Sequence, residues 1–138
     1  MAKFGSVRKT VREAVATTIE AGLSGAAKVL AYNPVSPRGI SPLVSVFTDP
    51  HRLPTGMDKS ANFPCGIVVS IWVRRDDDAG GAQDAADAVD TLAGQLVDVM
   101  EEVYNARETQ DPDAFYEIID GKPYMIEFHY FDVDWWLE

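Results

Sequence analysis

The sequence predicts one α+β domain, in which a mostly antiparallel or mixed β-sheet carries two main helices packed on one face. Two long segments repeat apolar residues at helical spacing, and short β-branched runs lie between and after them. Proline- and glycine-containing stretches separate these elements. The predicted order is α-β-β-β-α-β-β, and a length of 138 residues suits a single domain over residues 1–138.

The first helix is predicted from Ser6 to Ala21, because Val7, Val11, Val15 and Ile19 recur every four residues on one face. A short strand is expected from Lys28 to Tyr32. Residues 33–42 contain three prolines, which cannot donate to a sheet ladder, so they predict an extended connector. The segment Leu43–Thr48 alternates as a strand does.

Residues 49–64 contain three prolines and no periodicity, and we expect them to form a long exposed loop. Loops of this length in compact domains are often functional. The run from Cys65 to Arg75 that follows is rich in β-branched residues. This composition predicts a central strand that is covered on both faces.

The second helix is predicted from Asp84 to Tyr104, with an apolar stripe on one side and acidic residues on the other. The chain then predicts a hairpin: a strand from Tyr116 to Ile119, an Asp120-Gly121 turn, and a return strand from Pro123 to Val133. On the return strand, Glu127 and His129 are expected to share a face.

Composition excludes several classes of function. The net charge of −10 would repel phosphate backbones, which disfavours nucleic-acid binding as a main activity. No apolar run approaches the roughly 20 residues of a membrane span, so no membrane partner is expected. The single Cys65 begins an apolar run, and a buried, inert thiol is the favoured interpretation over a nucleophile.

The run Asp76, Asp77, Asp78 raises the possibility of a metal-dependent enzyme. In an extended chain Asp76 and Asp78 point to one side and Asp77 to the other, so the run supplies at most two ligands. Further ligands would have to come from Glu117, Glu127, His129, Asp132 or Asp134. Acids ahead of a helix also stabilise its N-terminal dipole, and we favour that structural interpretation.

Other catalytic patterns are missing from the sequence. There is no Gly-x-Ser-x-Gly elbow and no glycine-rich phosphate loop, and no sequence pattern places His51 or His129 beside a serine. We therefore expect no enzyme activity, no catalytic residue, no bound metal and no cofactor.

Several residues instead suggest contacts with partners. Arg8, Lys9 and Arg12 make the start of the first helix basic, although a solvated helix face is the favoured interpretation. Arg52, Leu53, Met57 and Phe63 lie in the predicted loop. Trp135 and Trp136 crowd the last residues, where they either cap the domain's own core or form an interface, two equally supported alternatives.

Taken in order, the stretches AGLSGAAKVLAYNP, PRGISPLVSVF, FPCGIVVSIWV, DAADAVDTLAGQLVDVMEEV and FYEIIDGKPYMIEFHYFDV cover nearly the whole chain. Their arrangement resembles the tail terminator (tail completion) proteins of long-tailed bacteriophages. The resemblance is architectural and includes no short signature motif, so it assigns no role to any single residue.

The resemblance implies a structural virion protein, assembled in the host cytoplasm, that forms a homo-oligomeric ring, typically a hexamer. Such a ring ends polymerisation of the tail tube and joins the tail to the head connector, and DNA passes through its lumen without specific binding. The basic start of the first helix and the acidic face of the second are a candidate pair of ring surfaces.

Three alternatives remain open at the level of sequence. One is another head–tail connector or neck protein of a phage. The second, from a different class, is a metal-dependent phosphodiesterase that uses Asp76 and Asp78. The third is a small ligand-binding regulator.

Overall fold

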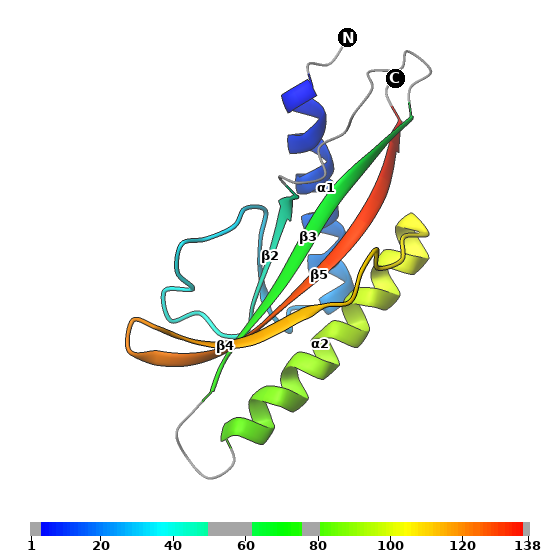
Figure 1. Cartoon of the computed structure of the whole chain (residues 1–138). Coiled ribbons are helices and arrows are strands. Elements are labelled where there is room, and N and C mark those ends of the chain that lie inside the picture. The colour runs from blue at the N-terminus through cyan, green and yellow to red at the C-terminus, as the bar shows by residue number, and fades with distance from the viewer. Residues whose placement is uncertain (1–3, 50–61, 76–80, 137–138) are drawn as a thin grey trace.

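In a computed structural model that describes residues 4–49, 62–75 and 81–136, two helices pack on one face of a five-stranded sheet (Figure 1). The elements in chain order are α1 (Phe4–Leu23), β1 (Lys28–Leu30), β2 (Leu43–Thr48), β3 (Asn62–Arg74), α2 (Gly81–Tyr104), β4 (Asp113–Ile119) and β5 (Lys122–Trp136). Both the predicted fold class and the predicted order of elements are confirmed.

The sheet has the order β1-β2-β3-β5-β4. β1 runs parallel to β2, and the other three pairs of neighbours are antiparallel. β3 and β5 pair along their whole overlap, from Asn62 opposite Trp136 to Arg74 opposite Tyr124. These two long strands form the centre of the sheet, and β1 and β4 are its edges.

The main core lies between the helices and the sheet. Every residue from Cys65 to Val73 in β3 that points toward the helices is apolar and buried, which explains the β-branched run in the sequence. Other buried members come from the facing stripes of both helices, including Val11, Val15, Ile19, Val89, Leu92, Leu96 and Met100. The apolar stripes predicted for both helices therefore face the sheet.

A second, smaller core lies on the sheet face away from the helices. It consists of Leu43, Trp72, Tyr124 and Ile126, with Leu30, Ile119 and Phe128 packed around them. The Trp72 indole N–H donates to Ser70 Oγ at 2.7 Å, and the Ser70 hydroxyl also contacts that of Ser45. These contacts satisfy polar groups that burial would otherwise leave without partners.

The hairpin turn joins this second core to the segment after β1. Asp120 and Gly121 have φ values of 53° and 77°, as the predicted two-residue turn requires. At the turn, Ser36 Oγ donates to Asp120 Oδ2 at 2.8 Å. The turn between β4 and β5 therefore contacts the segment that follows β1, although β1 and β4 are opposite edges of the sheet (Figure 1).

Several boundaries differ from the predicted ones. β3 begins at Asn62, so the predicted loop over residues 49–64 loses its last three residues to a strand. β4 begins at Asp113, three residues before Tyr116, because an exposed edge strand needs no apolar alternation to form. α2 begins at Gly81, three residues before the predicted start at Asp84, so Asp84 lies in its first turn.

Candidate functional site

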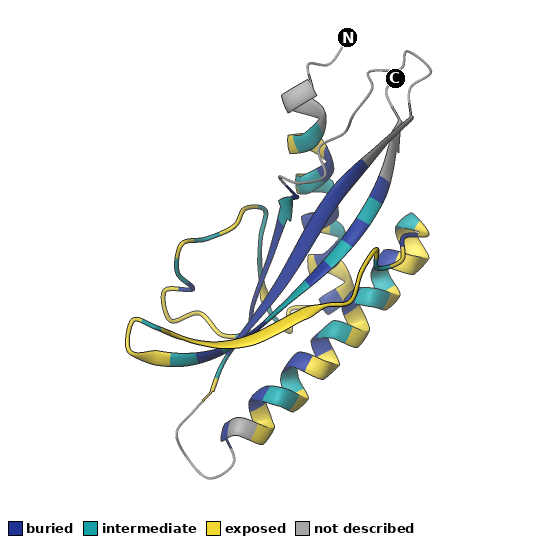
Figure 2. Cartoon of the chain, in the orientation of Figure 1, coloured by how far each residue is buried: buried dark blue, intermediate teal, exposed yellow. Residues whose placement is uncertain are grey.

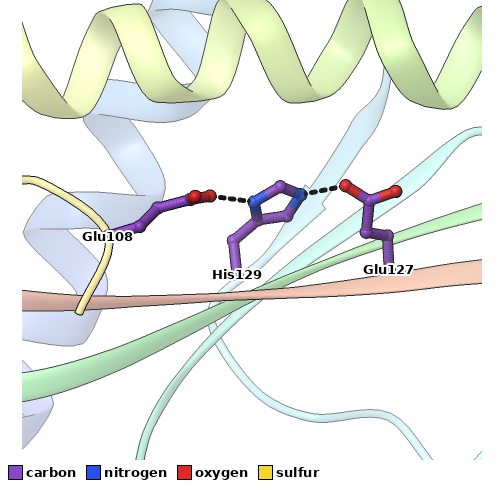
Figure 3. A network of polar contacts seen from close by, with 3 residues as sticks. All are labelled: Glu108, Glu127 and His129. Atoms are coloured by element: carbon purple, nitrogen blue, oxygen red, sulfur yellow. Dashed lines mark hydrogen bonds and ion pairs between the residues drawn. The ribbon is translucent and has the colours of Figure 1, made fainter. Parts of the chain in front are cut away.

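Two carboxylates flank the imidazole of His129 between the sheet and α2 (Figure 3). His129 lies on β5, points toward the helix layer and is only 2% exposed. Its Nδ1 contacts Glu108 Oε1, and its Nε2 lies 2.7 Å from Glu127 Oε1. Because Nε2 and Glu127 do not meet in hydrogen-bond geometry, this second contact is an ion pair whenever the ring carries both protons.

The loop after α2 positions Glu108. Asn105, with a φ of 49°, ends the helix, and the Ala106 amide donates to Met100 O. The Thr109 amide then donates to Tyr130 O at 2.9 Å, next to a bridge between Glu108 and Phe131. These contacts hold the loop against β5. The Glu108 carboxylate therefore meets the His129 ring on the side opposite Glu127.

This network does not have the geometry of a metal site. The two carboxylates occupy opposite nitrogens of one ring, whereas metal ligands must converge on a single point. Within the described ranges, no group of three or more His, Cys, Asp or Glu side chains is placed to hold a metal ion. The arrangement ties the loop after α2 to the sheet.

The residues considered as possible metal ligands divide into separate groups. Glu127 and His129 do meet, as their shared face predicted, but their third partner is Glu108, which the sequence did not indicate. Glu117 and Asp132 lie on the opposite sheet face, because residues paired across β4 and β5 share a side. Asp76, Asp77, Asp78, His51 and the Asp134 side chain lie outside the described residues.

Cys65 is fully buried beneath α1, as predicted for an inert thiol. Burial raises its pKa to about 11, an effect that Arg8 partly offsets and Asp132 reinforces. A thiol with so high a pKa is protonated near neutral pH and is a poor nucleophile.

The basic residues of α1 do not form the solvated face that the sequence favoured. Arg8 and Arg12 are half-buried, and their Nε atoms are out of contact with solvent. They lie one helical turn from Val11, Val15 and Ala16 of the buried stripe, so their side chains cover the edge of the core. Lys9 alone is exposed, and its Nζ lies 4.0 Å from Glu13 Oε1.

The other predicted contact residues are placed only in part. Phe63 belongs to β3 and not to a loop, and its backbone pairs with that of Trp135. Trp136 is opposite Asn62, so β5 continues through both tryptophans. The side chains of these residues, and Arg52, Leu53 and Met57 altogether, lie outside what the structure describes.

Apolar side chains on β4 form a surface that the sequence did not predict. Phe115, Tyr116 and Ile118 are 38%, 61% and 74% exposed, and Figure 2 shows exposure along most of the strand. Phe115 packs edge-on against Phe128, whereas Tyr116 lies beneath the Arg75 guanidinium. We call these three residues and the unpaired edge of β4 the β4 surface.

A second apolar surface follows β1. Residues 30–40 line a groove of about 540 Å³. Among them Tyr32, Val35 and Ile40 are 56%, 101% and 39% exposed. We call this feature the 30–40 groove.

The described helices include none that is long and apolar enough to cross a membrane. A comparison with models of known protein families finds none that matches the chain, and a comparison with curated proteins finds no match either.

Proposed function

We propose that this protein is a structural subunit of a bacteriophage tail. In this proposal it forms a ring at the end of the tail tube, stops tube polymerisation and joins the tail to the head connector. The observation that carries the proposal is that the subunit exposes two different apolar surfaces, the β4 surface and the 30–40 groove. The resemblance in element order to tail terminator proteins supports the same assignment.

Two unlike surfaces are what a ring subunit requires. A head-to-tail ring joins one patch of each subunit to a different patch of the next, whereas a two-fold dimer needs only one self-complementary patch. Exposed apolar side chains gathered on an edge strand are uncommon in proteins that act alone. The β4 surface and the 30–40 groove meet this requirement.

The charge of the chain is compatible with a DNA passage. A net charge of −10 disfavours lasting contact between the ring lumen and a polyanion. The network at His129 fits a structural role, because it ties the loop after α2 to β5.

Imaging and mass measurement test the proposal. The purified protein is measured by native mass spectrometry and imaged by negative stain, alone and after mixing with tail tubes that lack a cap. We expect a closed ring, seated at one end of each tube, and no further growth when tube subunits are added. A protein that neither forms a ring nor binds tubes would contradict the proposal, whereas binding to isolated head connectors alone would favour a neck protein.

A further inference from the structure

We infer that the β4 surface of one subunit docks onto the 30–40 groove of a second copy of this chain. The inference rests on the proposed function, because it names the contact that would build the ring.

The β4 surface combines an unpaired strand edge with apolar side chains on both faces. β4 is the last strand of the sheet and pairs only with β5 in the described chain. Natural edge strands are usually protected by lysine, proline, bulges or a covering element. From Asp113 to Ile119 this strand contains no lysine and no proline, although Asp113 and Glu117 are charged, and Tyr116 and Ile118 point away from the second core.

The 30–40 groove offers an apolar lining in a restrained segment of the chain. Its lining is mainly apolar, and the backbone is held by a turn in which the Ile40 amide donates to Pro37 O at 2.9 Å. Pro34 and Pro37 further restrict the segment. A preformed groove loses little conformational freedom when an apolar side chain enters it.

Charge selects the groove, and not a second β4, as the partner. β4 itself contains Asp113 and Glu117 and no basic residue, a net charge of −2. Pairing β4 with β4 of another copy would bring two such segments into contact. Residues 21–48, which include the groove, contain Lys28 and Arg38 and no acidic residue. This stretch of a strongly acidic chain therefore attracts the β4 segment, and attraction of this kind also fixes orientation.

Three single variants and one mixture test the contact. Ile118→Asp damages the β4 surface and leaves the groove intact, and Val35→Asp does the reverse. Each alone should raise the concentration needed for self-association by at least about tenfold. Val103→Asp, at an apolar residue of α2 that is 57% exposed, is the matched control and should assemble as the unchanged chain does.

The decisive sample is an equimolar mixture of Ile118→Asp and Val35→Asp. One intact β4 surface and one intact groove remain between the two proteins, so the mixture should form dimers of twice 15.2 kDa that grow no further. Sedimentation velocity measures these species, and circular dichroism verifies that each variant is folded.

The outcomes separate this inference from the proposed function. Normal assembly of either variant, or a mixture that stays monomeric, would overturn the inference. So would an unchanged chain that remains monomeric to millimolar concentration in the absence of tubes. A ring observed on tail tubes in any of these cases would leave the proposed function standing with a different contact.

Discussion

Gly22 permits a close approach of α1 to α2. A Cβ placed on this residue would lie 2.3 Å from Val99 Cγ2, well inside the van der Waals distance. Valine has a stiff χ1 in a helix, so it cannot turn away without strain. Glycine at this position is therefore explained by packing between helices.

We expect Gly22→Ala to lower the free energy of unfolding by about 1–3 kcal/mol. Adding Val99→Ala should recover part of that loss, because it removes the atom that clashes. Urea unfolding of both single variants and the double variant gives the coupling energy between the two sites. A Gly22→Ala protein as stable as the unchanged chain would contradict the proposed clash.

His129 is expected to contribute more to stability than any single exposed charge. In His129→Gln, Glu108 and Glu127 lose the group that separates and partners them, at a cost of about 3 kcal/mol. Glu117→Gln, an exposed residue on the other sheet face, should change the free energy of unfolding by less than about 0.5 kcal/mol. Chemical denaturation at pH 7 compares the two, and equal effects would contradict a structural role for the network.

The raised pKa of Cys65 predicts that the protein loses stability at alkaline pH. Its pKa is about 11 in the folded chain against 9.0 as the ordinary value, so the unfolded state releases the thiol proton first. Stability from this group is therefore complete below pH 9 and is lost as the pH rises toward 11, by at most about 1.4 kcal/mol per pH unit.

Denaturant unfolding of the unchanged chain and of Cys65→Ala, from about pH 8 to about pH 10.5, checks this effect. This range covers the onset of deprotonation of the thiol in the unfolded chain. The stability difference between the two proteins should shrink as the pH rises. Tyr130, whose pKa burial and Asp113 raise to about 12, is present in both and cancels in the comparison. Parallel pH profiles would show that the thiol does not titrate on unfolding.

At the scale of elements, two glycines should respond in opposite directions to the same substitution. Gly121 has a φ of 77° in the hairpin turn, whereas Gly94 is in α2 with open space where a Cβ would lie. Gly121→Ala should destabilise by about 1 kcal/mol or more, because it strains the turn. Gly94→Ala should stabilise by about 0.5–1 kcal/mol, because alanine favours the helix.

Thermal unfolding of the two alanine variants tests this pair, and hydrogen exchange localises the effect. Faster exchange in Gly121→Ala should be concentrated in β4 and the paired part of β5. A similar shift of the same sign in both variants would contradict the assignment of the turn.

Elements with strong periodicity could be predicted from the sequence, and those defined by their neighbours could not. The run from Cys65 and the stripe of α2 each indicate their own structure. The first half of β4 is an edge strand with polar and apolar residues exposed on both sides, so it gives little periodic signal. Arg8 and Arg12 show the same difficulty, because long basic side chains can cover a core edge as readily as face water.

At the scale of the whole molecule, the candidate site depended on contacts between distant segments. Glu108 and His129 meet only because the loop after α2 is fixed against β5, and no local pattern encodes that contact. The exposure of Tyr116 and Val35 likewise depends on which elements pack beside them in the fold. Sequence periodicity assigns a residue to a face, but it does not say what covers that face.

The place of β5 has a consequence for how the chain matures during synthesis. β5 follows four other strands in the chain, yet it lies between β3 and β4. While β5 is still within the ribosome, one edge of β3 and its β-branched run have no partner. At that stage β4 also has no strand to pair with. Folding of the sheet therefore waits for the last strand to emerge, and until then the chain is in the state most exposed to aggregation.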